Sequence, residues 1–69
     1  MWKVFSMAVD SPSDSRWKEV GKIALNLDRI EAFIPVDGGE QVVRIKTLSG
    51  EEINLWCSFR VLLREVTQG

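Results

Sequence analysis

The sequence predicts a mostly β domain of the α+β class, with about five short antiparallel strands in a sheet or partial barrel and one C-terminal helix. Apolar and polar residues alternate in several short runs, and glycine-containing turn signals separate these runs. Near the C-terminus the apolar residues recur at a helical spacing instead. Sixty-nine residues, 45% of them hydrophobic, are enough for one small domain spanning residues 1–69.

The first element is a strand over residues 2–9. Apolar side chains occupy both parities of this run, so we predict a strand that is buried on both faces. The run 10–15 then reads Asp-Ser-Pro-Ser-Asp-Ser. Asp and Ser side chains bond to their own backbone and Pro12 removes a donor, so the strand ends in a surface loop.

The second run, 16–27, also alternates, with Ile23, Leu25 and Leu27 at one parity. It predicts a strand in which Gly21 is a candidate bulge. An amphipathic helix from Ser15 to Leu25, capped by Ser15, is the alternative interpretation. We favour the strand, followed by a tight turn over residues 26–29.

The third run, 30–36, alternates again and predicts another strand. Pro35 marks a sheet edge or the end of this strand, because proline cannot donate to a strand ladder. The sequence Asp-Gly-Gly-Glu at residues 37–40 is a strong turn signal. It predicts a hairpin between this strand and the next one, at 42–47.

The second hairpin is predicted with its register. A two-residue loop at Ser49 and Gly50 would place apolar residues opposite polar ones on the core face. A three-residue loop over residues 48–50, with Gly50 at positive φ, avoids this mismatch. The resulting pairs are Thr47 with Glu51, Ile45 with Ile53, and Val43 with Leu55 on the core face, and Lys46 with Glu52, Arg44 with Asn54, and Val42 with Trp56 on the other.

The C-terminal segment predicts a helix of roughly ten residues. Four apolar residues fall at i, i+3, i+4 and i+7 and so define one helical face. Ser58 precedes them as a candidate N-cap, and Gly69 lies beyond the end. The residues of this face are Phe59, Leu62, Leu63 and Val66.

The residue inventory argues against a metal site, a cofactor site and catalysis. The chain has no His and a single cysteine, Cys57, so it cannot assemble the usual zinc ligand set or an internal disulfide. General acid–base catalysis near neutral pH relies mostly on His, and the carboxylates here are scattered. We therefore expect no enzyme and no cofactor, and we expect Cys57 to be a small buried apolar residue. Without a disulfide, signal peptide or membrane span, a cytoplasmic location is the expectation.

The outer face of the second hairpin carries the first candidate binding site. Its residues are Trp56, Arg44, Lys46 and Val42. Arg beside Trp is a recurrent pair at protein interfaces, where both residue types are enriched. The alternative is structural: Trp56 merely covers the outer sheet, with Arg44 lying over it.

A second candidate site would bind nucleic acid. Its residues are Arg16, Trp17, Lys18 and Lys3, since aromatic residues among basic ones stack and hold single strands. The net charge of the chain is −1, and acidic residues lie close by in the sequence, among them Asp10 and Glu19. We therefore rank nucleic-acid binding below protein binding.

Residues 26–66 also resemble a known family. The run Asn-Leu-Asp-Arg-Ile-Glu-Ala at 26–32, the run Val-Arg-Ile-Lys-Thr-Leu-Ser-Gly-Glu-Glu-Ile at 43–53 and the helix that follows are similar to FlbD-type proteins of flagellar operons. They are also similar to the β-rich LytTR-like modules of bacterial regulators and phage-borne proteins. The resemblance implies a β-rich module of bacterial or phage origin.

These observations lead to an expected function. We expect a small non-enzymatic protein that binds another protein as an interaction or regulatory module, with inhibition as one form of that role. A thin core and a free strand edge near Pro35 or Met1 also favour a homodimer, because a chain this short buries only about 60% of its unfolded surface. A third possibility is an oligomeric phage inhibitor or small-ligand sponge. No membrane partner is expected.

Overall fold

A computed structural model describes residues 1–11, 16–36, 38 and 40–68. In this part of the chain, five antiparallel strands form one sheet in the order β2-β1-β5-β4-β3, and one C-terminal helix packs on it. The α+β, mostly β fold class predicted from the sequence is therefore confirmed. The elements are β1 (Trp2–Ser11), β2 (Arg16–Asn26), a 3-10 turn η1 (Leu27–Arg29), β3 (Ile30–Val36), β4 (Val42–Thr47), β5 (Glu52–Trp56) and α1 (Phe59–Gln68).

β1 and β2 form a long ribbon, and residues 16–26 are a strand rather than the alternative helix. The ladder shifts by one residue between two pairs, Ser6 with Lys22 and Met7 with Val20. Gly21 is the extra residue, and its φ of +43° is one that other residues adopt at a cost. The predicted bulge at Gly21 is thus confirmed, whereas the predicted loop at 12–15 lies outside the described residues.

β3 and β4 form the predicted hairpin, and β3 lies at one edge of the sheet, as Pro35 indicated. The alternation of β3 is broken near its start. The ladder shifts between Ile30 and Ala32, so that Ile30 and Phe33 both pack against the core. Ile34 then points to the other face, where 53% of it is exposed. Sequence alternation alone places Ile30 and Ile34 on the same face, because it takes no account of this bulge.

β4 and β5 have the register predicted from the sequence. Val43 pairs with Leu55 and Ile45 with Ile53 on the core face. The Thr47 N–H donates to the Glu51 carbonyl at 2.9 Å and closes the three-residue loop, in which Gly50 has a φ of +91°. The apolar face and the turn geometry therefore select the same pairing.

Helix α1 begins after Ser58, whose Oγ accepts a hydrogen bond from the Val61 N–H at 3.1 Å. Leu62 is fully buried in the core. Leu63, which the sequence placed on the same face, is 42% exposed, so that expectation is wrong for this residue. The helix turns a narrow stripe toward the sheet, and Leu63 lies at the side of that stripe.

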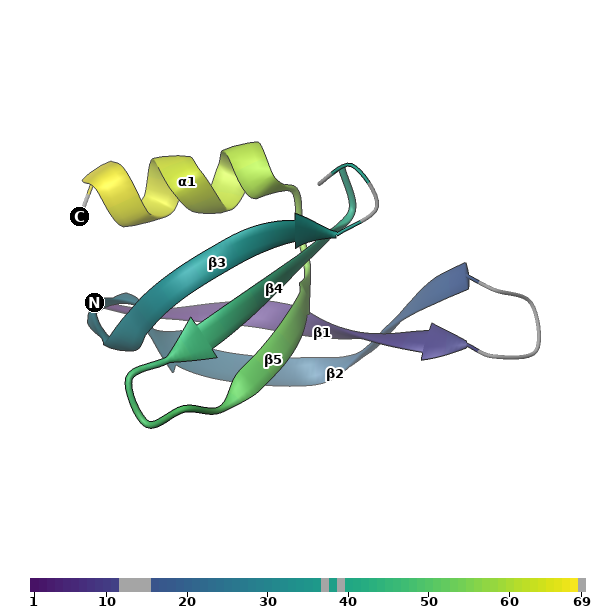
Figure 1. Cartoon of the computed structure of the whole chain (residues 1–69), viewed down its shortest axis with the longest axis horizontal. Coiled ribbons are helices and arrows are strands. Elements are labelled where there is room, and N and C mark those ends of the chain that lie inside the picture. The colour runs from purple at the N-terminus through teal and green to yellow at the C-terminus, as the bar shows by residue number, and fades with distance from the viewer. Residues whose placement is uncertain (12–15, 37, 39, 69) are drawn as a thin grey trace.

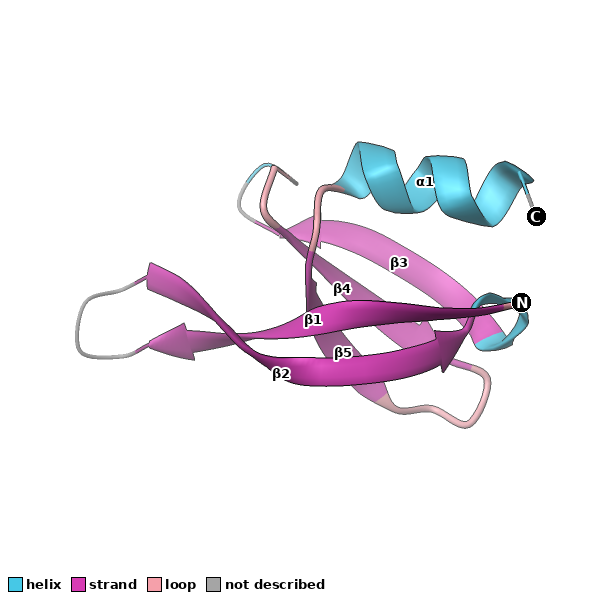
Figure 2. Ribbon diagram, turned by 180° about the vertical axis from the view of Figure 1, so that it is seen from behind, coloured by secondary structure: helices cyan, strands magenta, loops and turns pink. Residues whose placement is uncertain are grey.

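The core lies between the β1–β2 ribbon, the meander formed by β3, β4 and β5, and α1. Figures 1 and 2 show the β1–β2 ribbon crossing the β3–β4–β5 meander at an angle, with α1 running back over β3. β1 and β5 join the two units through the pair Met7 and Leu55. The buried residues that form the cluster are Phe5, Leu25, Leu27, Val43, Ile45, Leu55 and Leu62.

Candidate interaction surface

The sheet has one face covered by α1 and one that α1 leaves uncovered, which we call the open face. Strand pairing determines which side chains lie on it, because successive side chains alternate between the faces. By this alternation the open face has a part on the β1–β2 ribbon and a part on β3, β4 and β5, joined at the pair Met7 and Leu55. Its residues are Trp2, Val4, Ser6 and Ala8 of β1, Glu19, Lys22 and Ala24 of β2, Glu52, Asn54 and Trp56 of β5, Val42, Arg44 and Lys46 of β4, and Ala32, Ile34 and Val36 of β3.

Trp56 is the last residue of β5 and lies on the open face, near the point where β5 meets β1. The Met7 and Leu55 pair places Ser6 on one side of Trp56, and the β4 ladder places Val42 on the other. The Trp56 side chain is half-buried. Its large ring therefore has both a supporting and an exposed part, which is the arrangement expected of an aromatic anchor in a binding site.

Arg44 lies two ladder pairs along from Trp56, on the same face of the sheet. Its Nε donates to the Asn54 Oδ1 at 3.0 Å, which holds the guanidinium group over β4 and β5. Lys46 is exposed opposite Glu52, as predicted. Three of the four predicted protein-binding residues thus lie together at the surface of the open face.

Val42, the fourth predicted residue, is only 1% exposed. A hollow of about 80 Å³ is lined by Trp17 and Val36 together with Val42 and residues 40–41, so the start of β2 approaches this end of β4. The Val42 side chain is therefore too deeply buried to touch a partner. It supports Trp56 from within the sheet.

Two exposed apolar residues of the open face were missed by the sequence reasoning. Trp2 is 68% exposed and Val4 is 61% exposed, and Val4 pairs with the exposed Ala24 of β2. The prediction that the first strand is buried on both faces holds for residues 5–8 and is wrong at its start and at its end, where Val9 is 46% exposed. The only available signal was the position of these residues two apart, on the parity opposite the core residue Phe5.

A shallow hollow of about 150 Å³ extends the open face toward the edge strand β3. It is lined on β3 by Ala32 and Ile34, and on β4 by Arg44 and Lys46. Basic side chains therefore border an apolar strip at this end of the face.

The predicted nucleic-acid residues do not come together. Lys3 pairs with Leu25 near one end of the β1–β2 ribbon, and its ammonium group forms an ion pair with Glu65 of α1. Lys18 pairs with Val9 near the opposite end. Arg16 and Trp17 adjoin Lys18. Lys3, the fourth predicted residue, therefore lies away from the other three.

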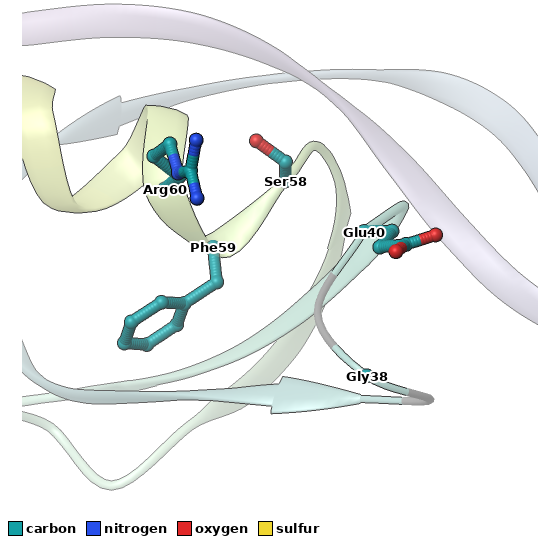
Figure 3. A pocket seen from close by; sticks show the side chains of 5 residues that line it. All are labelled: Gly38, Glu40, Ser58, Phe59 and Arg60. Atoms are coloured by element: carbon teal, nitrogen blue, oxygen red, sulfur yellow. The ribbon is translucent and has the colours of Figure 1, made fainter.

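A hollow of about 510 Å³ lies at the start of α1. Figure 3 shows its lining, with Ser58, Phe59 and Arg60 on the helix side and Gly38 and Glu40 opposite. Among the described residues, no group of three or more His, Cys, Asp or Glu side chains is placed to hold a metal ion. The described lining of this hollow therefore does not indicate a metal site.

Cys57 follows β5 and packs against the core. Burial raises the pKa of its thiol, so the thiol is less readily ionised than that of an exposed cysteine. Its environment therefore resembles that of an apolar packing residue, as the sequence suggested.

No protein-family model matches the chain, and neither a curated protein nor a solved structure matches it. The resemblance to FlbD-type and LytTR-like proteins therefore stays a prediction. Within the described ranges, no helix is both long and apolar enough to cross a membrane.

Proposed function

We propose that the chain is a small non-enzymatic interaction or regulatory module, and that it binds another protein through the open face around Trp56. One observation carries this proposal. The sheet face opposite α1 leaves Trp2 and Val4 of β1 mostly exposed and Trp56 of β5 half-buried, although a domain of this size has little apolar surface to spare.

The composition of the open face supports a protein partner. Interfaces between proteins have an apolar centre rich in Trp and Arg and a polar rim. The open face carries aromatic and aliphatic side chains, and its basic residues Lys22, Arg44 and Lys46 are accompanied by the acidic residues Glu52 and Glu19, which lies opposite Ala8. The complementary surface is therefore an apolar patch with charged groups of both signs at its border.

The test compares two truncations of large apolar side chains. Trp56→Ala removes a large aromatic side chain of the open face, while Leu48→Ala removes an exposed residue of the β4–β5 loop outside it. The wild type and both variants are used, after nuclease treatment, to capture partners from the organism that encodes the chain. Circular dichroism first verifies that both variants fold.

We expect a stoichiometric protein partner to be recovered with the wild type and with Leu48→Ala. Loss of a central Trp at an interface weakens binding by about 30-fold or more, so Trp56→Ala should recover little. Equal recovery with both variants would exclude the open face. Recovery of nucleic acid in samples left untreated with nuclease, with no protein partner, would instead favour the alternative site at Arg16, Trp17 and Lys18.

A further inference from the structure

We propose that the chain forms a two-fold symmetric homodimer in which β3 pairs antiparallel with β3 of a second copy. This inference goes beyond the proposed function, because it uses an edge of the sheet rather than the open face. It specifies which strand edge pairs, which side chains flank it and how the two copies are oriented.

β3 is the last strand in the sheet order, so the backbone groups on its outer side have no ladder partner among the described residues. Its sequence is Ile-Glu-Ala-Phe-Ile-Pro-Val, with Glu31 as its only charged residue. Pro35 removes a donor near the end of the strand, and the bulge between Ile30 and Ala32 lies near its start. The middle of this edge therefore remains able to accept a further strand.

The edge of β3 has apolar side chains on both faces. On the open face, Ile34 is 53% exposed. On the covered face, Phe33 contacts Phe59 of α1, with 5.3 Å between the ring centroids. A strand added here would need apolar residues at both parities, and β3 itself has this property.

The flank of α1 extends the apolar surface beyond β3. Phe59 faces β3 and Glu65 faces β1, so the two sides of the helix are assigned by their contacts. Leu63 is four residues after Phe59, which rotates it only about 40° further round the helix on the β3 side. The Leu63 side chain, which is 42% exposed, therefore lies next to the free edge of β3.

Symmetry explains why Leu63 is apolar. When two identical edge strands pair antiparallel, the two-fold axis is perpendicular to the sheet, so the two α1 helices lie on the same face of the continuous sheet. The axis brings their flanks, with Phe59 and Leu63, toward each other. A simple peptide strand would leave Leu63 uncovered, whereas a second copy covers it.

The charges are complementary in the same arrangement. Complete overlap of two β3 strands centres the axis at Phe33, which places Glu31 beside Pro35 of the second copy. Arg60 lies near this end of β3, because it lines the same hollow as Gly38, which follows the strand (Figure 3). Each Glu31 therefore lies near Arg60 of the other copy and near its helix N-terminus, both of which favour an acidic group.

Glu40 lines that hollow as well, but Figure 3 shows it across the hollow from Arg60. Glu31 of the second copy approaches from the side of β3, where Phe59 and Arg60 begin the helix. A parallel pairing would instead place the two Glu31 residues together. The charges thus select the antiparallel arrangement.

Sedimentation equilibrium of the purified chain tests the dimer. The expected mass at high concentration is twice the 7.9 kDa of one chain. Leu63→Glu places one charge from each copy in the contact. It should raise the dissociation constant by about 100-fold. Val61→Glu is the matched control, since Val61 is 47% exposed on the other flank of α1 and should leave the dissociation constant unchanged.

A charge exchange tests the orientation. Glu31→Arg and Arg60→Glu alone should each raise the dissociation constant by about tenfold, and the double variant should restore it. A monomer at every concentration up to about 1 mM would overturn the proposal. So would a dimer that tolerates Leu63→Glu, or a double variant as weak as the single ones. Trp56→Ala lies away from β3 and should leave the dimer intact, so this test is independent of the proposed function.

Discussion

The two free edges of the sheet differ in how they are protected. β2 carries four charged residues, Arg16, Lys18, Glu19 and Lys22, and a bulge at Gly21. β3 carries one charged residue, a proline near its end and a bulge between Ile30 and Ala32. Charges, prolines and bulges are common devices against unwanted strand pairing. With four charges against one, β2 has the more strongly protected edge and β3 the more open one, within the same small sheet.

This difference indicates that the chain does not protect its edges uniformly. A thin core gains little from apolar residues that stay in water, yet β3 exposes Ile34 and its neighbouring helix exposes Leu63. These side chains have a use if a second strand covers them. Each of the four predictions that follow concerns β2, β3 with the helix that packs over it, or the junction between β1 and β5.

The largest effect is expected from Leu62→Ala, which weakens the packing of α1 over β3. Leu62 is fully buried where α1 packs on the core. Its truncation should lower the free energy of unfolding by about 3 kcal/mol, through lost burial and a residual cavity. Urea denaturation measures this change, and Val61→Ala is the control, with a change within about 0.5 kcal/mol. Similar values for the two variants would show that α1 is not anchored through Leu62.

The next effect concerns the protected edge. Gly21→Ala places a Cβ at a φ of +43°, 3.3 Å from the Met7 Cε. Because this backbone conformation is unfavourable for other residues, we expect a loss of about 1–2 kcal/mol of stability. Glu19→Ala, at a neighbouring position of the same strand, should change it by less than about 0.5 kcal/mol. An unchanged melting temperature for Gly21→Ala would mean that β2 can dispense with the bulge.

A third change makes β3 resemble β2. Ala32→Lys adds a charge to the open edge, next to Lys46 in the β4 ladder. Charges at an edge disfavour strand addition, so the dimer dissociation constant should rise by about tenfold, while stability changes by less than about 1 kcal/mol. Ala24→Lys makes the same substitution on β2 and should leave the dissociation constant unchanged. Equal weakening by both would locate the contact elsewhere.

The smallest effect concerns the junction between the β1–β2 ribbon and the β3–β4–β5 meander. Alternation from the Met7 and Leu55 pair brings Cys57 beside Phe5 of β1. Because burial raises the pKa of the Cys57 thiol, the folded chain keeps this thiol neutral at a pH where the unfolded chain ionises it, above about 8.5. The free energy of unfolding should therefore decrease as the pH rises through that value.

Urea denaturation of the wild type and of Cys57→Ala, at about pH 7 and about pH 9.5, isolates this contribution. The wild type should lose more stability than the variant over this range, since only the wild type has the thiol. A greater loss in the variant would contradict a raised pKa and a packed junction.

Local patterns predicted most of the elements. The β4–β5 register followed from the requirement that Val43 and Ile45 share a face with Ile53 and Leu55. The bulge at Gly21 and the helix cap at Ser58 followed from the conformational and hydrogen-bonding preferences of single residue types. The same register placed Arg44 and Lys46 on one face with Trp56, although it did not reveal that Val42 is buried.

The sequence by itself thus determined the elements, their pairing within each hairpin and the side chains that share a face. These depend on neighbours close along the chain. Only the tertiary structure decided which faces are covered: Trp2 and Val4 are exposed, Val42 is buried, and Leu63 is 42% exposed. Burial at these sites depends on how the two ribbons cross and where α1 packs, which are contacts between residues far apart in the sequence.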